Sequence, residues 1–402
     1  MLPYGRQSIN EDDIAAVVAV LRGDFLTQGP VVENFERRFA ARVGAGHGVA
    51  VSSATAALHL ALRVAGVGRG DRVVTSPLTF LASANSAAHV GAKPDFSDID
   101  PISGTLDPVA LEQNWQPDTR AVVAVDYAGQ ACEFPEIARI ARERGAVVIE
   151  DACHAVGGAF HAGPTGSPAV PIGGHPWADL TVFSFHPVKT MTTGEGGMLV
   201  TDRADWAARA RRLRSHGILR DPTGFVTPAD DEVLGEKGPW FYEMQDLGWN
   251  YRLTDLQCAL GLSQLGRLDG FLTRRREIVA AYNTAFAGLD WLVTPGLRDE
   301  RDAATTSWHL YTAQVDFDAL GRSRTEVMAE LRAAGVGTQV LYMPVHLQPW
   351  YRKTFGYGPG KCPVAESFYR RALSLPLYPA MTDADVEHVI ASVKAVAPVC
   401  VS

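Results

Sequence analysis

Residues 181–197 read TVFSFHPVKTMTTGEGG, an apolar strand that ends at Ser184 and continues into a polar, glycine-rich loop carrying Lys189. A lysine acts as a nucleophile only where its neutral amine is accessible, and burial near a sheet edge is one way to achieve this. Most lysines are solvated, so the stretch taken alone also fits a surface lysine in a loop. The segments on either side of it decide between these interpretations.

Short apolar runs rich in β-branched residues alternate with helical patterns around this stretch. They lie at 48–51, 72–76, 121–126, 146–151, 180–185 and 198–201. Such runs are typical of a sheet that is covered on both faces. The helical segments between them are long enough to cross over between parallel strands. We therefore expect an α/β fold, with a large, mostly parallel sheet domain over residues 1–270 that includes N-terminal helices.

A smaller C-terminal α+β domain is expected over residues 271–402. A charged helix is predicted at 271–286, and AQVDF, TEVMAELRAAG and DADVEHVIASVKAV follow it as strand and helix patterns. A chain of 402 residues also exceeds what one hydrophobic core usually covers. Residues 161–178, dense in Gly and Pro, predict a surface loop.

Composition excludes several classes of protein. The formal charge is -8, without a basic tail or stripe, so a nucleic-acid partner is not expected. The five cysteines are scattered and never spaced as C-x-x-C, which predicts neither a disulfide framework nor a zinc site, and fits a reducing cytoplasm. No signal pattern or apolar run of about 20 residues predicts a membrane segment.

Acidic residues and a histidine follow the strand in AVVIEDACHAVGG, residues 146–158. Open α/β sheets bind their ligands at the carboxyl ends of strands. A carboxylate at Asp151, next to Glu150, suits the protonated nitrogen of a pyridine ring. The same residues also fit a helix cap at Asp151 and a hydrogen-bonded structural role for His154. A metal pair lacks a third ligand, so we expect no metal site.

Two further strand ends carry candidate residues. In VSSATAALHLAL, Ser52, Ser53, Ala54 and Thr55 stand where a helix begins, which suits a phosphate but also fits a plain helix cap. In SPLTFLASAN, Phe80 can cover a flat cofactor or simply join the core. The G-x-G-like run at 66–70 precedes a strand instead of following one, which counts against a dinucleotide site.

Together these segments resemble the DegT/DnrJ/StrS-type sugar aminotransferases, which are pyridoxal-phosphate (PLP) enzymes of transferase fold type I. The chain is most similar to their PseC-like branch, which aminates a UDP-linked 4-keto-6-deoxy-N-acetylhexosamine. The segments that carry the resemblance are PYGRQSI, GDFLTQGP, SSATAALHLAL, EDACHAVGG, FSFHPVKTMTTGEGGM, SHGI, DLGWNYRLTDLQ and MPVHLQPWY. They run nearly end to end.

The resemblance implies a role for each matching residue. Lys189 would be the Schiff-base lysine, Asp151 would pair with the pyridine nitrogen, and Phe80 would stack on the ring. His154 would lie near the ring and its hydroxyl side. The residues that would hold the phosphate are Ala54, Thr55, Ser184 and, from the neighbouring subunit, Asn250. The active site would then require a homodimer.

Substrate contacts are expected at Tyr4, Tyr342 and His346. Two departures from the family pattern bear on this part of the site, because Ala54 stands in SATAAL where many relatives have NGTAAL, and Val340 stands where a histidine is frequent. An anionic nucleotide needs local cations in an acidic chain. The candidates, chosen for their neighbourhood, are Arg6, Arg220 and Arg252.

The function that the resemblance implies is a two-step transamination, with glutamate or glutamine as donor and glutamate favoured. A related PLP sugar dehydratase would carry histidine in place of Lys189. An aminotransferase for another keto-sugar or a cyclitol remains open. Other classes are a nicotinamide oxidoreductase, disfavoured by the missing glycine fingerprint, and an inactive binding or regulatory protein, disfavoured because Lys189, Asp151 and Ser184 are all present.

Overall fold

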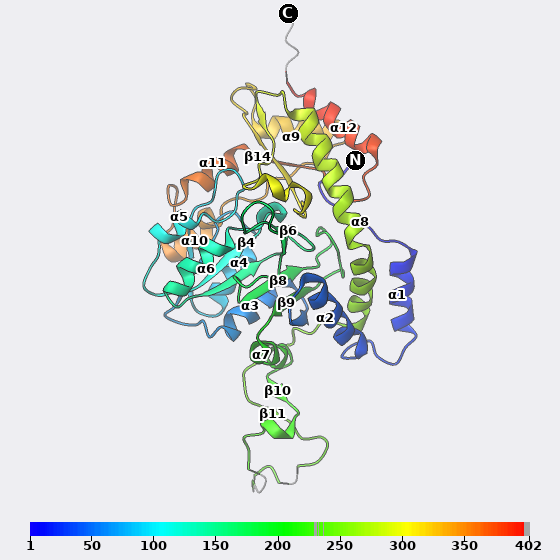
Figure 1. Ribbon diagram of the computed structural model, residues 1–402, viewed down its shortest axis with the longest axis vertical. Helices are drawn as coiled ribbons and strands as arrows, with labels where there is room; N and C mark the ends of the chain where they lie inside the picture. Colours follow the sequence, from blue (N-terminus) through cyan, green and yellow to red (C-terminus); the bar gives the residue numbers. More distant parts are fainter. Residues whose placement is uncertain (229–230, 232, 236, 398–402) are drawn as a thin grey trace, which may run out of the picture.

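A computed structural model describes residues 1–228, 231, 233–235 and 237–397 of the chain. Its largest element is a seven-stranded sheet, in the centre of Figure 1. In spatial order the strands are β1 (His47–Val51), β9 (Gly197–Thr201), β8 (Leu180–Ser184), β5 (Val147–Asp151), β4 (Thr119–Val125), β2 (Arg72–Thr75) and β3 (Lys93–Phe96).

Most neighbours in this sheet are parallel, as expected from the apolar runs. Strand β9 is the exception, because it runs antiparallel to both β1 and β8. Strand β3 was not predicted, since its KPDF sequence carries Pro94. Proline lacks the N–H that an interior strand must donate, and β3 tolerates it at the edge of the sheet.

Helices cover both faces of the sheet, which explains the near-continuous apolar strands. One face packs against α2 (Pro30–Val43), α6 (Phe134–Glu143) and the first half of α8 (Asp255–Phe286). The other face packs against α3 (Ala54–Val64), α4 (Leu81–His89) and α7 (Ala204–Arg214). The remaining helices of this part are α1 (Glu11–Leu21), α5 (Pro108–Gln113) and the short turns η1 (Tyr127–Gly129) and η2 (Pro222–Gly224).

A smaller antiparallel sheet forms the C-terminal part, and it has a core of its own. Its strands are β12 (Leu292–Val293), β13 (Tyr311–Val315) and β14 (Ala372–Leu375). Its helices are η3 (Glu300–Ala304), α9 (Arg324–Ala333), η4 (Val345–Leu347), α10 (Pro349–Phe355), α11 (Pro363–Arg371) and α12 (Asp383–Lys394).

The helix predicted at 271–286 is the second half of α8, which begins sixteen residues earlier at Asp255. Thr254 caps α8 and exchanges side-chain and backbone hydrogen bonds with Gln257. The domain boundary proposed at residue 270 therefore falls inside one continuous helix, which runs along both parts of the molecule (Figure 1).

Residues 161–178 are not the simple surface loop that their Gly and Pro content predicted. Val170–Pro171 forms β7, which pairs with β6 (Ala159–Phe160). The His175 side chain is fully buried, and its Nε2 lies 3.1 Å from Oε1 of Glu150. This segment therefore covers the buried Glu150 side chain.

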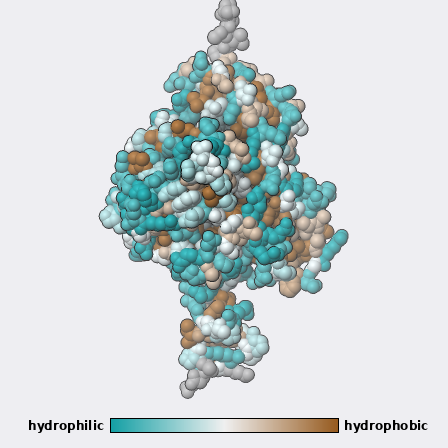
Figure 2. Space-filling model, viewed as in Figure 1, coloured by the Kyte–Doolittle hydropathy of each residue, from teal (hydrophilic) through white to brown (hydrophobic). Residues whose placement is uncertain are grey.

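An extended arm projects from the body beyond α7, at the bottom of Figure 1. It carries β10 (Ile218–Leu219) and β11 (Glu243–Met244), which pair antiparallel. Large apolar and aromatic side chains are exposed on it, and Figure 2 shows brown, hydrophobic patches on the arm. They include Val226, Trp240, Tyr242, Met244 and Leu247.

Candidate active site

A cavity of about 680 Å³ lies at the carboxyl ends of β4, β5 and β8. Nine of the residues expected at a functional site line it. They are Tyr4, Ala54, Thr55, Phe80, Asp151, His154, Ser184, Lys189 and Tyr342. The fold thus brings together segments that are separated by more than three hundred residues in the chain.

Lys189 reaches this cavity from the loop that follows β8, and its backbone N–H donates to the carbonyl of His186. The pKa of the Lys189 amine is lowered from 10.5 because burial disfavours the charged form. The nearby Cys153 and Asp151 oppose this shift in part. Burial therefore shifts the amine toward its neutral, nucleophilic form.

Asp151 ends β5, and hydrogen bonds hold both of its carboxylate oxygens. Oδ2 accepts from the hydroxyl of Ser83, on α4, at 2.7 Å. Oδ1 accepts from the backbone N–H of Cys153 at 3.2 Å. The carboxylate is therefore fixed in orientation while it faces the cavity.

The first turn of α3 lines another wall of the cavity. Ser53 caps this helix by accepting from the N–H of Ala56 at 3.1 Å, and Ala54 and Thr55 begin the helix. Gly197 of β9 approaches closely, since a Cβ there would lie 2.6 Å from the Ala54 nitrogen. The helix terminus, with Ser184 nearby in the same lining, suits a phosphate group.

His154 and Tyr342 form a hydrogen-bonded pair in the cavity wall. The backbone N–H of Ala128 donates to Nδ1 of His154 at 3.3 Å. The pKa of His154 lies well below 6.5, mainly because the ring is buried, so the ring is neutral. A neutral ring that accepts at Nδ1 carries its proton on Nε2, and this N–H donates to the Tyr342 hydroxyl at 3.1 Å.

The orientation of this pair has a consequence for ligands. Because the Tyr342 oxygen accepts from His154, its own proton is available to donate to a group in the cavity. Ala128, whose N–H donates to Nδ1 of His154, has a positive φ of +58°. Phe80, which is 57% exposed, stands over the same space with its ring centroid 6.2 Å from that of Tyr342.

Two expected site residues lie elsewhere in this chain. His346 is fully buried, with its Nε2 2.9 Å from Oε1 of Glu366, and it packs near Phe96 instead of lining the cavity. Asn250 is exposed and forms an isolated bridge with Ser215, also outside the cavity.

The candidate arginines do not line the cavity either. The Arg220 guanidinium lies 5.4 Å from the ring centroid of Tyr242, on the arm. Among the described residues, Lys189 is the one Lys or Arg of the lining. Cations for an anionic substrate must therefore come from outside this lining.

Several lining residues were not predicted from the sequence. They include Thr79, Ser83, Cys153, His186, Val188, Glu195 and Leu341. Ser83 could have been predicted from the sequence, because it lies three residues after Phe80 in the first turn of a helix and so points to the same side. The residues present fit PLP: a buried amine, a fixed carboxylate and a helix terminus converge on one cavity large enough for the cofactor and a substrate.

Among the described residues, no helix is both long enough and apolar enough to cross a membrane. Within the same part of the chain, no group of three or more His, Cys, Asp or Glu side chains is arranged to hold a metal ion.

Comparison with known proteins agrees with the geometry of the site. The model of the DegT/DnrJ/EryC1/StrS aminotransferase family matches residues 7–394. The spore coat polysaccharide biosynthesis protein SpsC of Bacillus subtilis is 44% identical over 394 residues, which cover 98% of this chain and 96% of SpsC.

Solved structures of similar fold include two sugar-related aminotransferases. Helicobacter pylori PseC, an aminotransferase involved in the biosynthesis of pseudoaminic acid, is 28% identical, with a TM-score of 0.85 and 98% of each chain covered. The PLP form of the putative sugar aminotransferase Spr1654 from Streptococcus pneumoniae is 30% identical, with a TM-score of 0.84 and the same coverage. The chain therefore belongs to the DegT/DnrJ/EryC1/StrS family and is a PLP-dependent sugar aminotransferase.

Proposed function

We propose that this enzyme transfers an amino group from glutamate to the C4 ketone of a UDP-linked 4-keto-6-deoxy-N-acetylhexosamine, as the PseC-like branch does. The observation that carries the proposal is the cavity in which the Lys189 amine, the Asp151 carboxylate and the first turn of α3 meet. The relationship to SpsC and PseC supports a sugar as substrate.

We assign the cofactor contacts as follows. Ala54, Thr55 and Ser184 would bind the phosphate of PLP, and Asp151 would keep the pyridine nitrogen protonated. Phe80 would cover the ring. Bound PLP supplies an electron sink that lets an amino group pass between two carbon skeletons.

The protein's own residues would handle the protons. The neutral amine of Lys189 would take the α-proton of the donor and return a proton to the reacting carbon, as a general base and then a general acid. The Tyr342 hydroxyl, held by the Nε2–H of His154, would donate to an oxygen of the sugar. Tyr4 would line the sugar side of the cavity.

We also propose that two copies share each active site. The donor carboxylates and the nucleotide are anionic, yet Lys189 is the one Lys or Arg side chain that the described residues place in the cavity lining. Asn250, exposed at the base of the arm, would complete the phosphate contacts of the neighbouring subunit.

The test is an assay with PLP, glutamate and the UDP-linked 4-keto sugar, in which mass spectrometry detects the 4-amino product and 2-oxoglutarate. Lys189→Ala should form no product, whereas Lys353→Ala, which changes an exposed lysine of α10, should match the wild type.

Two further substrates separate the alternatives. A 3-keto nucleotide sugar and a keto-cyclitol should each be aminated far more slowly than the 4-keto sugar. If either reacts faster, the 4-keto assignment is wrong while the transamination itself stands. If glutamate fails to remove the visible absorbance of the lysine-bound cofactor but glutamine succeeds, the donor assignment is wrong.

A further inference from the structure

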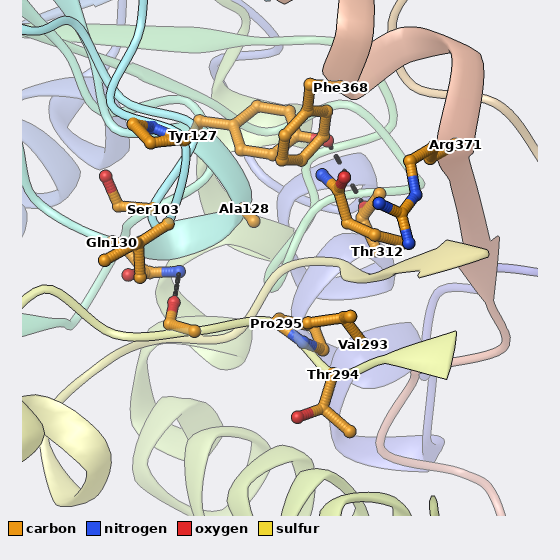
Figure 3. A pocket seen from close by; sticks show the side chains of 14 residues that line it. Ser103, Tyr127, Ala128, Gln130, Val293, Thr294, Pro295, Thr312, Phe368 and Arg371 are labelled. Carbon is orange, nitrogen blue, oxygen red and sulfur yellow. Dashed lines mark hydrogen bonds between the residues drawn. The ribbon is translucent and has the colours of Figure 1, made fainter. Parts of the chain in front are cut away.

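A second cavity, of about 240 Å³, lies between the two parts of the molecule (Figure 3). Residues 101–103 and η1 form its wall on the side of the large sheet. Strands β12 and β13, the segment after β12, and α11 form the wall on the other side. It is thus separate from the cavity that contains Lys189, and the mechanism does not use it.

The described residues that line this cavity contribute one charge, and it is positive. Arg371, the last residue of α11, is the one charged side chain that the described residues contribute to its lining. In Figure 3 its side chain extends from α11 toward Thr312. The carboxylate nearest to it, Asp316, lies 3.8 Å away and is 42% exposed, so this ion pair is weak.

The other walls combine apolar rings with uncharged polar side chains, among them Gln130, Thr312 and Gln314. The rings of Phe368 and Tyr127 lie together on one side, and Val293, the last residue of β12, and Pro295, just beyond it, face them (Figure 3). A lone guanidinium beside apolar rings and uncharged polar groups is complementary to a molecule that has one carboxylate and a largely apolar body. Arginine binds carboxylates through two parallel hydrogen bonds, which favours a carboxylate over a neutral polar group.

The position of the cavity also connects it to the active site. The Tyr127 hydroxyl donates to the carbonyl of Leu341, which lines the Lys189 cavity next to Tyr342. The neighbouring residue Ala128 lines the second cavity and donates its N–H to His154. An occupant would therefore pack against the backbone and side chain that position the His154 and Tyr342 pair.

We propose that this cavity is a second binding site, for a compact organic monocarboxylate of about ten non-hydrogen atoms, held by Arg371. Its volume lies below the range typical of drug-sized ligands, which limits the size of the occupant. Such a ligand would bridge the large sheet domain and the smaller sheet.

The experiment uses 4-fluorobenzoate as the probe, followed by fluorine NMR on the PLP-loaded enzyme in saturating glutamate. Glutamate converts the cofactor to its amine form, so 2-oxoglutarate is added in excess as well. With both present the donor site is occupied in either form of the cofactor, and any remaining saturable binding reports a different site. We expect a Kd on the order of millimolar, as small fragments give. The neutral analogue 4-fluorobenzamide should bind at least about tenfold more weakly, because it lacks the charge.

Matched arginine variants locate the site. Arg371→Gln should weaken 4-fluorobenzoate binding about tenfold or more, whereas Arg370→Gln, which changes the exposed neighbour outside the cavity, should leave it unchanged. Arg371→Lys keeps the charge and should restore part of the affinity. The side chain of Arg371 is 40% exposed, so these substitutions should not unfold the protein, and thermal unfolding checks this.

Four results would overturn the proposal. They are full displacement of the probe by glutamate and 2-oxoglutarate, equal binding of the amide and the carboxylate, equal effects of Arg371→Gln and Arg370→Gln, and absence of saturable binding to the wild type. None of them bears on the transamination, because the assay with the keto sugar is separate.

Discussion

Lys189 illustrates how a single residue is made reactive at a cost to stability. Its pKa in the folded protein is below the 10.5 of an exposed lysine, because burial penalises the charged amine. Between these two pKa values the unfolded chain binds one more proton than the folded chain. The penalty is therefore complete below the folded pKa, and it disappears as pH rises through 10.5.

This linkage predicts the stability of Lys189→Met in the PLP-free protein. The variant should be more stable than the wild type at neutral pH, and the difference should shrink as pH approaches 10.5. Urea unfolding at a series of pH values measures it, with Lys353→Met as the exposed control. A variant that is less stable than the wild type at neutral pH would contradict the electrostatic account.

The orientation of Asp151 gives a second prediction at this scale. Ser83→Ala removes the hydroxyl that donates to Oδ2, so PLP should bind about tenfold more weakly, as expected for a lost hydrogen bond to a charged group. Ser86→Ala is the control, because its hydroxyl donates to the Ser83 carbonyl on the same helix. Titration with PLP measures both, and equal affinities would show that Ser83 does not act through Asp151.

Tyr342 shows which single-residue roles the sequence could predict and which it could not. Motifs identified Lys189 and Asp151 as candidates, since Asp151 ends a strand and Lys189 lies in the loop after one. The bond between His154 and Tyr342 joins residues 188 positions apart, and Ala128, whose N–H donates to the same histidine, has a positive φ. No local pattern encodes such a contact. His346, whose motif placed it with the substrate, instead lies 2.9 Å from Glu366 and packs near Phe96, outside the cavity.

At the scale of elements, the contact between β9 and α3 determines the geometry of the expected phosphate site. Gly197→Ala would place a Cβ 2.6 Å from the Ala54 nitrogen and from the Ser53 carbonyl carbon. Backbone atoms cannot yield as a side chain can, so we expect a loss of about 1–3 kcal/mol in the free energy of unfolding. PLP affinity should fall with it, since the first turn of α3 would shift.

A glycine of α8 provides the control for this prediction. Gly266 is exposed, and a Cβ there would meet nothing within 4 Å. Gly266→Ala should therefore stabilise the helix by about 0.5–1 kcal/mol and leave PLP binding unchanged. Chemical denaturation distinguishes the two substitutions by sign, and a stabilising Gly197→Ala would refute the packing argument.

The sequence predicted elements well where periodicity was strong and failed where tertiary context decided. The apolar runs located the central strands, because burial on both faces demands such runs. The reversed direction of β9 left no trace in its own sequence, since GMLVT fits either orientation. Because of Pro94, the edge strand β3 was not predicted. The Gly and Pro content of residues 161–178 predicted a surface loop and gave no indication that His175 is buried.

At the scale of the whole molecule, the fold class follows from the order of strands and helices, whereas the assembly does not. One chain presents an arm with exposed apolar side chains and an exposed Asn250 near its base. No pattern within one sequence identifies a residue that would complete the site of a neighbouring subunit. The resemblance to a family was therefore the only feature of the sequence that indicated a shared active site. This proposal needs a direct test.

Mixing two inactive variants distinguishes shared sites from self-contained ones. The Lys189→Ala variant lacks the lysine amine but keeps Asn250. The Asn250→Ala variant keeps the lysine amine but lacks the asparagine amide. If Asn250 serves the neighbouring subunit, each mixed dimer has one intact site, because the amine of one chain faces the asparagine of the other.

Random exchange of equal amounts makes about half of the dimers mixed, so about a quarter of the wild-type activity should return. If Asn250 served its own chain, neither site of a mixed dimer would be intact, and mixing would restore nothing. The amination rate after unfolding and refolding the two variants together, compared with each variant refolded alone, therefore decides whether the active site belongs to one chain or to two.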